Sequence, residues 1–293
     1  MEFLQVKNLS FEYPKRSKKA LDNISFSVKK GEFVLLYGES GCGKTTLLQT
    51  LITQIAPIGK LSGSISFNGE DISSVNAGNI GFVSQQPDGQ IVTDRVWSEL
   101  AFGPENLGIK PDIIKGRIAE MSNYFGIQDW FHKSTYELSG GQKQILNLAS
   151  VMITQPKLLI LDEPTAGLDP KERVKFRNLF SSFAEDKIVI LSTHIVTDVE
   201  YIADEILVIK GGTLLKKGAE STIIQEISGK VWECRVTKPE AERLENRFTV
   251  CNSKTENGEA VLRIVSDSKP CDTAVSVSPC LEDLYLYYFH GEV

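Results

Sequence analysis

Long apolar runs are missing from this sequence. No stretch approaches the roughly 18 to 20 residues that a membrane-spanning helix needs, and Met1 to Gln5 lack the pattern of a signal peptide. We therefore expect neither secretion nor membrane insertion by this chain alone. The five cysteines are never spaced as Cys-x-x-Cys, which disfavours a zinc site and favours reduced thiols in the cytosol.

A basic surface is also missing. The 293 residues carry 32 Lys and Arg against 38 Asp and Glu, a formal net charge of −6. Most of this excess lies in residues 219–293, which hold 13 acidic and 8 basic residues. Such a chain would repel phosphate backbones, so we expect no nucleic-acid partner.

What is present is an ordinary globular composition, with 41% hydrophobic and 24% charged residues. Short apolar runs predict strands, and helical patterns stand between several of them. This alternation predicts an α/β fold with a parallel sheet that is covered on both faces. The predicted strands are 3–11, 21–28, 33–37, 65–67, 80–83, 158–161, 188–191, 205–209 and 213–217.

Two domains are predicted. Residues 94–153 have a helical pattern, and we expect Pro104, Gly108 and Pro111 to separate its pieces; a further helix is predicted over 171–185. Gly211-Gly212 predicts a hairpin between the last two strands. The composition then turns polar and acidic, so the domains are 1–218 and a small α+β appendage over 219–293.

The segment from Gly38 to Thr45 reads Gly-Glu-Ser-Gly-Cys-Gly-Lys-Thr and matches the phosphate-binding P-loop pattern. A triphosphate needs inward-pointing backbone N–H groups, which glycines permit, and the following helix directs its positive end at the phosphates. Lys44 can reach the β- and γ-phosphates, and the Thr45 hydroxyl can ligate Mg²⁺. Cys42 is either a small filler residue, the interpretation we favour, or an activated thiol.

Two further segments bear on the same chemistry. An apolar strand ends at Asp162 and Glu163, where an Asp suits Mg²⁺ and a Glu suits a general base for attacking water. Leu-Ser-Gly-Gly-Gln at 138–142 precedes a predicted helix over 142–153. Ser139 can cap that helix, and the glycines expose N–H groups, which makes this a second anion-binding helix terminus.

These motifs, in this order, resemble the ATP-binding subunits of ABC transporters over residues 1 to about 218, and the resemblance implies a P-loop NTPase core with an antiparallel β-subdomain and a helical signature subdomain. It makes 38–45 the Walker A motif, 138–142 the signature motif, Asp162 the end of Walker B and 166–169 the D-loop. The catalytic residues are then Glu163, His194, Lys44 and Gln85, and the Mg²⁺ ligands are Thr45, Gln85 and Asp162. The residues expected to contact ATP are Tyr13, Gly38, Ser40, Gly41, Cys42, Gly43, Lys44, Thr45, Thr46, Ser139, Gly140, Gly141, Gln142 and Asp169.

Two of these assignments have a near neighbour as an alternative. Phe11 competes with Tyr13 for the aromatic residue that stacks on adenine, and Gln86 competes with Gln85. The resemblance also implies that two chains pair head to tail, with each ATP between one P-loop and the partner's signature motif. The second ATP-binding subunit is the same chain or a different one. Membrane-spanning subunits would hold the pair at the cytoplasmic face of the membrane.

Two resemblances indicate opposite directions of transport. Residues 87–90 and 91–108 resemble energy-coupling factor ATPases, which drive vitamin and metal-ion uptake, whereas 166–173 and 281–289 resemble exporter ATPases. We favour uptake, because the segment after Gln85 is the one expected to face the membrane partner. The alternatives are an exporter subunit and a non-transport ATPase of the same superfamily, although the long coiled-coil insertion of chromosome-maintenance relatives is absent between Lys44 and Ser139.

Overall fold

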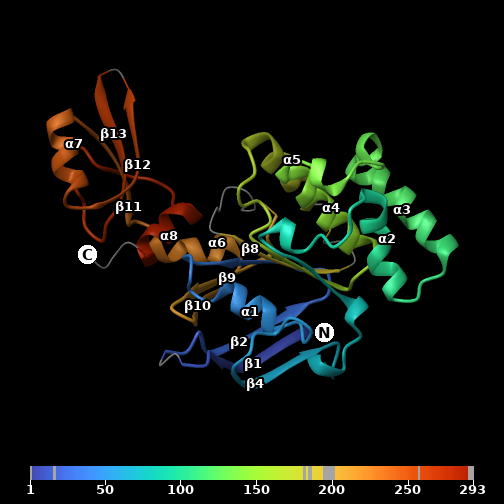
Figure 1. Cartoon of the computed structure of the whole chain (residues 1–293). Helices are drawn as coiled ribbons and strands as arrows, with labels where there is room; N and C mark the ends of the chain where they lie inside the picture. The colour runs from blue at the N-terminus through green and yellow to red at the C-terminus, as the bar shows by residue number, and fades with distance from the viewer. Residues whose placement is uncertain are drawn as a thin grey trace. The chain divides into compact units, whose positions relative to one another are not determined.

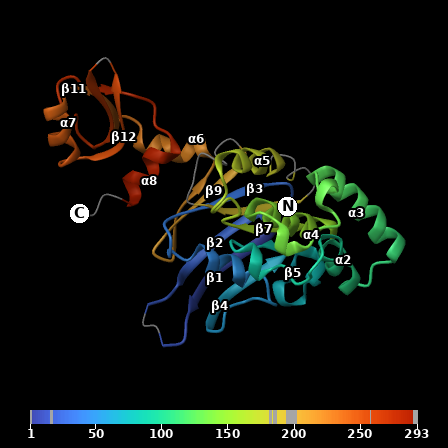
Figure 2. The same ribbon diagram turned by 45° about the horizontal axis from the view of Figure 1, so that its top comes forward.

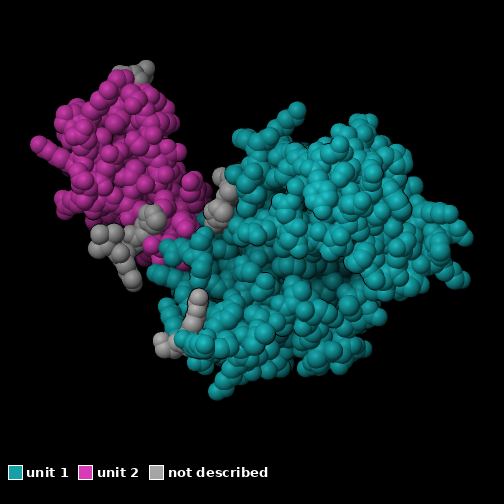
Figure 3. All heavy atoms as spheres, viewed as in Figure 1, with its two compact units in different colours: residues 1–215 teal, residues 216–293 magenta. Residues whose placement is uncertain are grey.

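The computed structural model describes residues 2–15, 18–180, 183, 187–193, 202–256 and 258–289. The chain divides into two compact units, Met1–Leu215 and Lys216–Val293, which Figure 3 shows in separate colours. No helix among the described residues combines the length and the apolar character needed to cross a membrane.

The centre of the first unit is a six-stranded sheet with the order β10-β9-β3-β8-β7-β6. Strands β6, β7, β8 and β3 are joined by parallel pairing, and β9 pairs parallel to β3, as the alternation of strands and helices predicted. Strands β3, β7 and β8 are buried along their whole length. Their bounds are β3 Phe33–Tyr37, β6 Ile80–Val83, β7 Leu158–Asp162, β8 Ile188–Thr193, β9 Glu205–Lys210 and β10 Thr213–Gly218.

A second sheet, with the order β2-β1-β4-β5, is antiparallel throughout. Alternate side chains of β1 and β2 are buried, and they join one hydrophobic core with side chains from the central sheet and from helix α1 (Lys44–Thr50). This shared core holds the Walker A helix against both sheets. The strand bounds are β1 Glu2–Glu12, β2 Leu21–Lys29, β4 Lys60–Phe67 and β5 Glu70–Asp71.

The helical part of the first unit contains α2 (Val96–Asn106), α3 (Pro111–Phe125) and α4 (Gly140–Ile153), which pack on one another. These helices lie together, away from β1, β2 and β4, in both Figure 1 and Figure 2. Pro104 does not separate two pieces as predicted, because α2 continues through it to Asn106; only Gly108 and Pro111 mark a break.

Helix α5 covers Pro170–Phe180 and begins one residue before the predicted helix over 171–185. Residues 181, 182 and 184–186 of that predicted helix lie outside the described residues. The buried side chains of α5 are Phe176 and Phe180, spaced four residues apart on one face.

The second unit is α+β, as expected. Its antiparallel sheet has the order β12-β13-β11-β14 and packs a small core around Cys234, Leu262 and Ile264. The buried carboxylate of Asp283 on α8 accepts hydrogen bonds from Arg263 Nε at 2.8 Å and Nη2 at 2.6 Å, which ties α8 to β13. The elements are α6 Glu220–Ile223, β11 Val231–Val236, α7 Lys238–Glu245, β12 Thr249–Glu256, β13 Glu259–Val265, β14 Val275–Ser276 and α8 Leu281–Phe289.

Candidate nucleotide-binding and catalytic site

The site lies at the carboxyl ends of four neighbouring parallel strands. The P-loop follows β3, Ser192 stands near the end of β8, Asp162 ends β7, and Gln85 follows β6. These strands are consecutive in the sheet, so segments that are far apart in sequence meet at one edge. This edge is where open α/β sheets bind their ligands.

The P-loop wraps around its own lysine. Gly43 has a φ of 111°, and a Cβ there would lie 2.7 Å from the carbonyl oxygen of Ala20, so a glycine is required for both reasons. The Lys44 ammonium donates to the carbonyl oxygens of Gly38 at 2.7 Å and Glu39 at 3.1 Å, and the side chain is only 5% exposed. Lys44 is thereby fixed inside the loop.

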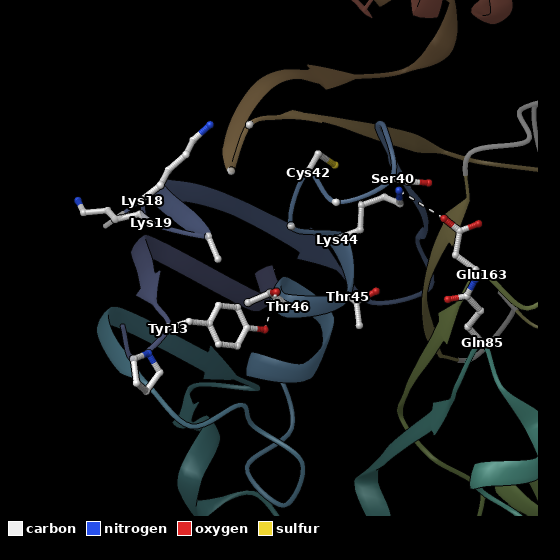
Figure 4. A pocket seen from close by; sticks show the side chains of 16 residues that line it. Tyr13, Lys18, Lys19, Ser40, Cys42, Lys44, Thr45, Thr46, Gln85 and Glu163 are labelled. Carbon is white, nitrogen blue, oxygen red and sulfur yellow. Dashed lines mark hydrogen bonds and ion pairs between the residues drawn. The ribbon is translucent and has the colours of Figure 1, made fainter. Parts of the chain in front are cut away.

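Glu163 lies opposite Lys44, with 3.3 Å between Lys44 Nζ and Glu163 Oε1, the dashed line in Figure 4. The backbone of Glu163 has a φ of 47°, which is uncommon for a residue other than glycine and is often found at functional sites. Its N–H donates to the carbonyl oxygen of Ser192 at 3.1 Å and to Ser192 Oγ at 3.0 Å. Strand β8 therefore holds the turn that aims the carboxylate.

Asp162 is buried beside Glu163. Burial raises the pKa of its carboxyl, and hydrogen bonds with the hydroxyls of Ser192 and Thr45 act against that rise. The Ser192 bond measures 2.7 Å. Thr45, Asp162 and Gln85 thus offer a hydroxyl, a carboxylate and an amide oxygen, which is the donor chemistry that Mg²⁺ prefers, and these residues fit the ion expected from the sequence.

A cavity of about 630 Å³ opens in front of the P-loop. Tyr13 lies on its wall and its hydroxyl is 3.0 Å from Thr46 Oγ1, whereas Phe11 is fully buried in the core. Gln85 lines the cavity on the same side as Glu163, opposite Tyr13 (Figure 4), and Gln86 does not line it. Of these two pairs, Tyr13 and Gln85 are therefore the members that line the cavity. The other lining residues are Pro14, Lys18, Lys19, Ala20, Ser40, Gly41, Cys42, Gly43, Lys44, Thr45, Gly211 and Gly212.

Burial acts against activation of the Cys42 thiol. Its side chain is 7% exposed, and burial raises the pKa of the thiol although Lys44 acts to lower it. The structure therefore agrees with the favoured interpretation, in which Cys42 is a small filler residue at a crowded point of the loop.

The signature motif is at the start of α4, where Ser139 caps the helix as predicted. Ser139 Oγ accepts from the N–H of Gln142 at 3.2 Å, and the Gln142 side chain accepts from the N–H of Ser139 at 2.9 Å. Residues 139–142 do not line the cavity in front of the P-loop, and neither does Asp169, which caps α5. His194 lies outside the described residues.

Ser192 is the main site residue that sequence reasoning missed. It is fully buried, and it contacts both Asp162 and the backbone of Glu163. In the sequence it is an ordinary polar residue near the end of an apolar run, and only its pairing with Asp162 across β7 and β8 shows its importance. Gly212 was predicted only as a turn residue, yet its N–H donates to the carbonyl oxygen of Cys42 at 2.9 Å and supports the P-loop.

Several known proteins are similar to this chain in sequence. The family model described as ABC transporter matches residues 21–166. A Bacillus anthracis ABC transporter ATP-binding protein is 41% identical over 85% of this chain, but the chain spans only 46% of that protein, about half the length of the first relatives it matches. An energy-coupling factor transporter ATP-binding protein EcfA2 from Caldanaerobacter subterraneus is 37% identical over 76% of this chain and 81% of its own length.

The fold has solved counterparts. The structure of cbiO1 from Clostridium perfringens, part of the ABC transporter complex cbiONQ, has 29% sequence identity and a TM-score of 0.67. That alignment covers 84% of this chain and the whole of the other, so it extends past the first unit. By its site, its sequence and its fold, the chain belongs to the ATP-binding proteins of ABC transporters.

Proposed function

We propose that this chain binds Mg-ATP in the cavity in front of the P-loop and hydrolyses it to drive transport through separate membrane subunits. The observation that carries the proposal is the convergence of Lys44, Asp162 and Glu163 at adjacent strand ends. Tyr13 would stack on the adenine at the far side of the cavity, and the P-loop amides would surround the phosphates.

The side chains divide the work of hydrolysis. Lys44 is long enough to move from the P-loop carbonyls to phosphate oxygens and to stabilise the charge that develops on them. Glu163, then released from Lys44, would accept a proton from the attacking water. Thr45, Asp162 and Gln85 would hold Mg²⁺. The bound ion would neutralise part of the negative charge of the phosphates. His194 is the residue that would sense the γ-phosphate.

Two chains are needed to complete one site in this proposal. Residues 139–142 form the positive end of α4, yet they do not line their own P-loop cavity. A head-to-tail pair would place them, together with Asp169, on the nucleotide of the partner. Phosphate contacts made by both chains would close the pair, and loss of the γ-phosphate would release it.

The membrane partner would dock on the helical part of the first unit. A largely apolar cavity of about 340 Å³ opens there, and Trp97, Ile114 and Phe131 are among its lining residues. Trp97 and Phe102 are each nearly half exposed, although both are large and apolar. Such a groove suits an apolar segment of a membrane subunit, which would hold the chain at the cytoplasmic face of the membrane.

Uptake of the energy-coupling factor type is the transport that we propose, with a vitamin or a metal ion as cargo. The support is the name of the Caldanaerobacter relative and the membership of cbiO1 in the cbiONQ complex, together with the sequence around residues 87–108. The exporter alternative depends on the resemblance of residues 166–173 and 281–289 alone.

The test is the substitution Glu163→Gln, which keeps the size of the side chain and removes the base. This variant should bind ATP, hydrolyse it at a rate at least about a hundredfold below that of the unmodified chain, and accumulate as an ATP-bound dimer. Phosphate release and sedimentation velocity measure these properties. Normal turnover by the variant would refute the role given to Glu163.

A further inference from the structure

The start of α4 has no negative charge of its own. No acidic residue lies in its first turn, and its capping box uses the neutral side chain of Gln142. The N–H groups of the first turn have no partner within the helix and form its positive end. In the proposed function this end receives the phosphate held by the partner chain, and the inference below rests on that function.

A carboxylate from another helix lies against this same turn. A Cβ on Gly141 would lie 2.7 Å from Glu172 Oε2 and closer still to Glu172 Oε1, so the glycine leaves the space that the Glu172 carboxylate occupies in this structure. Gly141 is buried at the start of α4 and has no side chain that would hold this carboxylate away. It admits the carboxylate of α5 to the first turn of α4.

Glu172 also caps its own helix, α5, apart from its contact with the first turn of α4. Its N–H donates to Asp169 Oδ1 at 2.8 Å, and its Oε2 is 3.4 Å from the N of Asp169, so the two residues form a capping box at the start of α5. Glutamine serves equally well at this position of a capping box, as Gln142 shows on α4. The cap therefore explains a Glu or a Gln at 172, but it does not require the charge.

We propose that the Glu172 carboxylate competes with the partner-held triphosphate for the positive end of α4 and thereby weakens ATP-driven pairing. A negative charge at a helix N-terminus stabilises the unpaired chain. The same charge repels an arriving phosphate. When the phosphate binds, the Glu172 side chain must either rotate away or stay close to it at a cost in electrostatic repulsion. Glu172 is a positioning residue that keeps the closed pair short-lived.

The test is Glu172→Gln in the stalled Glu163→Gln chain, with Mg-ATP, by sedimentation velocity at low and high salt. The neutral side chain keeps the cap, and we expect the dimer dissociation constant to fall about fivefold at low salt. High salt should shrink the difference because it screens charge. The matched control is Glu240→Gln, the same substitution at the same position of the capping box on α7, and it should leave the dissociation constant unchanged.

A second readout uses the chain with Glu163 intact. Glu172→Gln should lower the KM for ATP without raising kcat, because it strengthens binding of the ground state and of the transition state alike. An unchanged or weaker dimer, or an equal effect of the Glu240 control, would overturn the role of Glu172. If the Glu163→Gln parent itself stays monomeric with Mg-ATP, the proposed function fails and the inference fails with it.

Discussion

Ser192→Ala is the substitution that best tests how the acidic end of β7 is held. The change removes a buried hydroxyl that donates to Asp162 Oδ1 at 2.7 Å and accepts from the N–H of Glu163 at 3.0 Å. It leaves the apolar packing of β8 nearly intact, because alanine keeps the Cβ. Two side-chain hydrogen bonds, from Ser192 and Thr45, lower the pKa of Asp162, and only the one from Thr45 remains after the substitution.

The expected loss in the free energy of unfolding at pH 7.5 is about 2 kcal/mol. A hydrogen bond to a charged group contributes about 1.5–3 kcal/mol, and this one serves a carboxylate that is only 3% exposed. Burial already raises the pKa of Asp162, and removal of the Ser192 bond should raise it further. An acid whose folded pKa is raised favours folding when it is protonated, so the loss should be largest at neutral pH and shrink as the pH falls through the pKa of Asp162.

Urea unfolding at pH 7.5 and pH 5, followed by circular dichroism, measures both the loss and its pH dependence. Ser150→Ala is the matched control, because that hydroxyl donates only to the carbonyl oxygens of Leu146 and Asn147 within α4. The control should change stability by less than about 0.5 kcal/mol at either pH. If Ser192→Ala loses no more free energy of unfolding than the control, or if its loss grows as the pH falls, Ser192 does not stabilise the ionised Asp162 carboxylate as described.

Three further substitutions have definite expected results. Lys44→Ala should weaken ATP binding about a hundredfold in calorimetry, because it removes the cation that is fixed inside the P-loop; unchanged affinity would contradict its phosphate role. Tyr13→Ala should weaken ATP binding about tenfold while Tyr13→Phe retains it, since in the proposed function the ring stacks on adenine and the hydroxyl contacts Thr46 of the protein; equal losses would contradict this. Arg263→Ala should destabilise the second unit by about 3 kcal/mol in thermal unfolding, because Asp283 stays buried without its partner, and an unchanged melting temperature would contradict it.

The strand ends could be predicted from the sequence because each site segment directly follows a buried apolar run. The P-loop after 33–37 and the acids after 158–161 are local patterns, and parallel strands place their carboxyl ends at the same edge of a sheet. The cap at Ser139 was predictable for the same local reason. These features depend on the backbone and on nearest neighbours in the sequence.

Other features depend on contacts between distant segments, which no local pattern contains. Ser192 is important because β8 pairs with β7, and Glu172 because the first turn of α5 lies against that of α4. Pro104 was expected to break a helix, yet it lies within α2, where its neighbours on that helix are packed against α4. Tertiary packing outweighed the local preference there.

The central claim is that each triphosphate is bound by the P-loop of one chain and by the first turn of α4 of another. Mixing two inactive variants tests it directly: Lys44→Ala removes the P-loop lysine, and Ser139→Glu places a repelling charge at an exposed position of the signature motif. In a head-to-tail pair of the two variants, one site combines an intact P-loop with an intact signature motif. The account predicts ATP hydrolysis by the mixture that neither variant shows alone, whereas a mixture that stays at the mean of its two folded parents would contradict it.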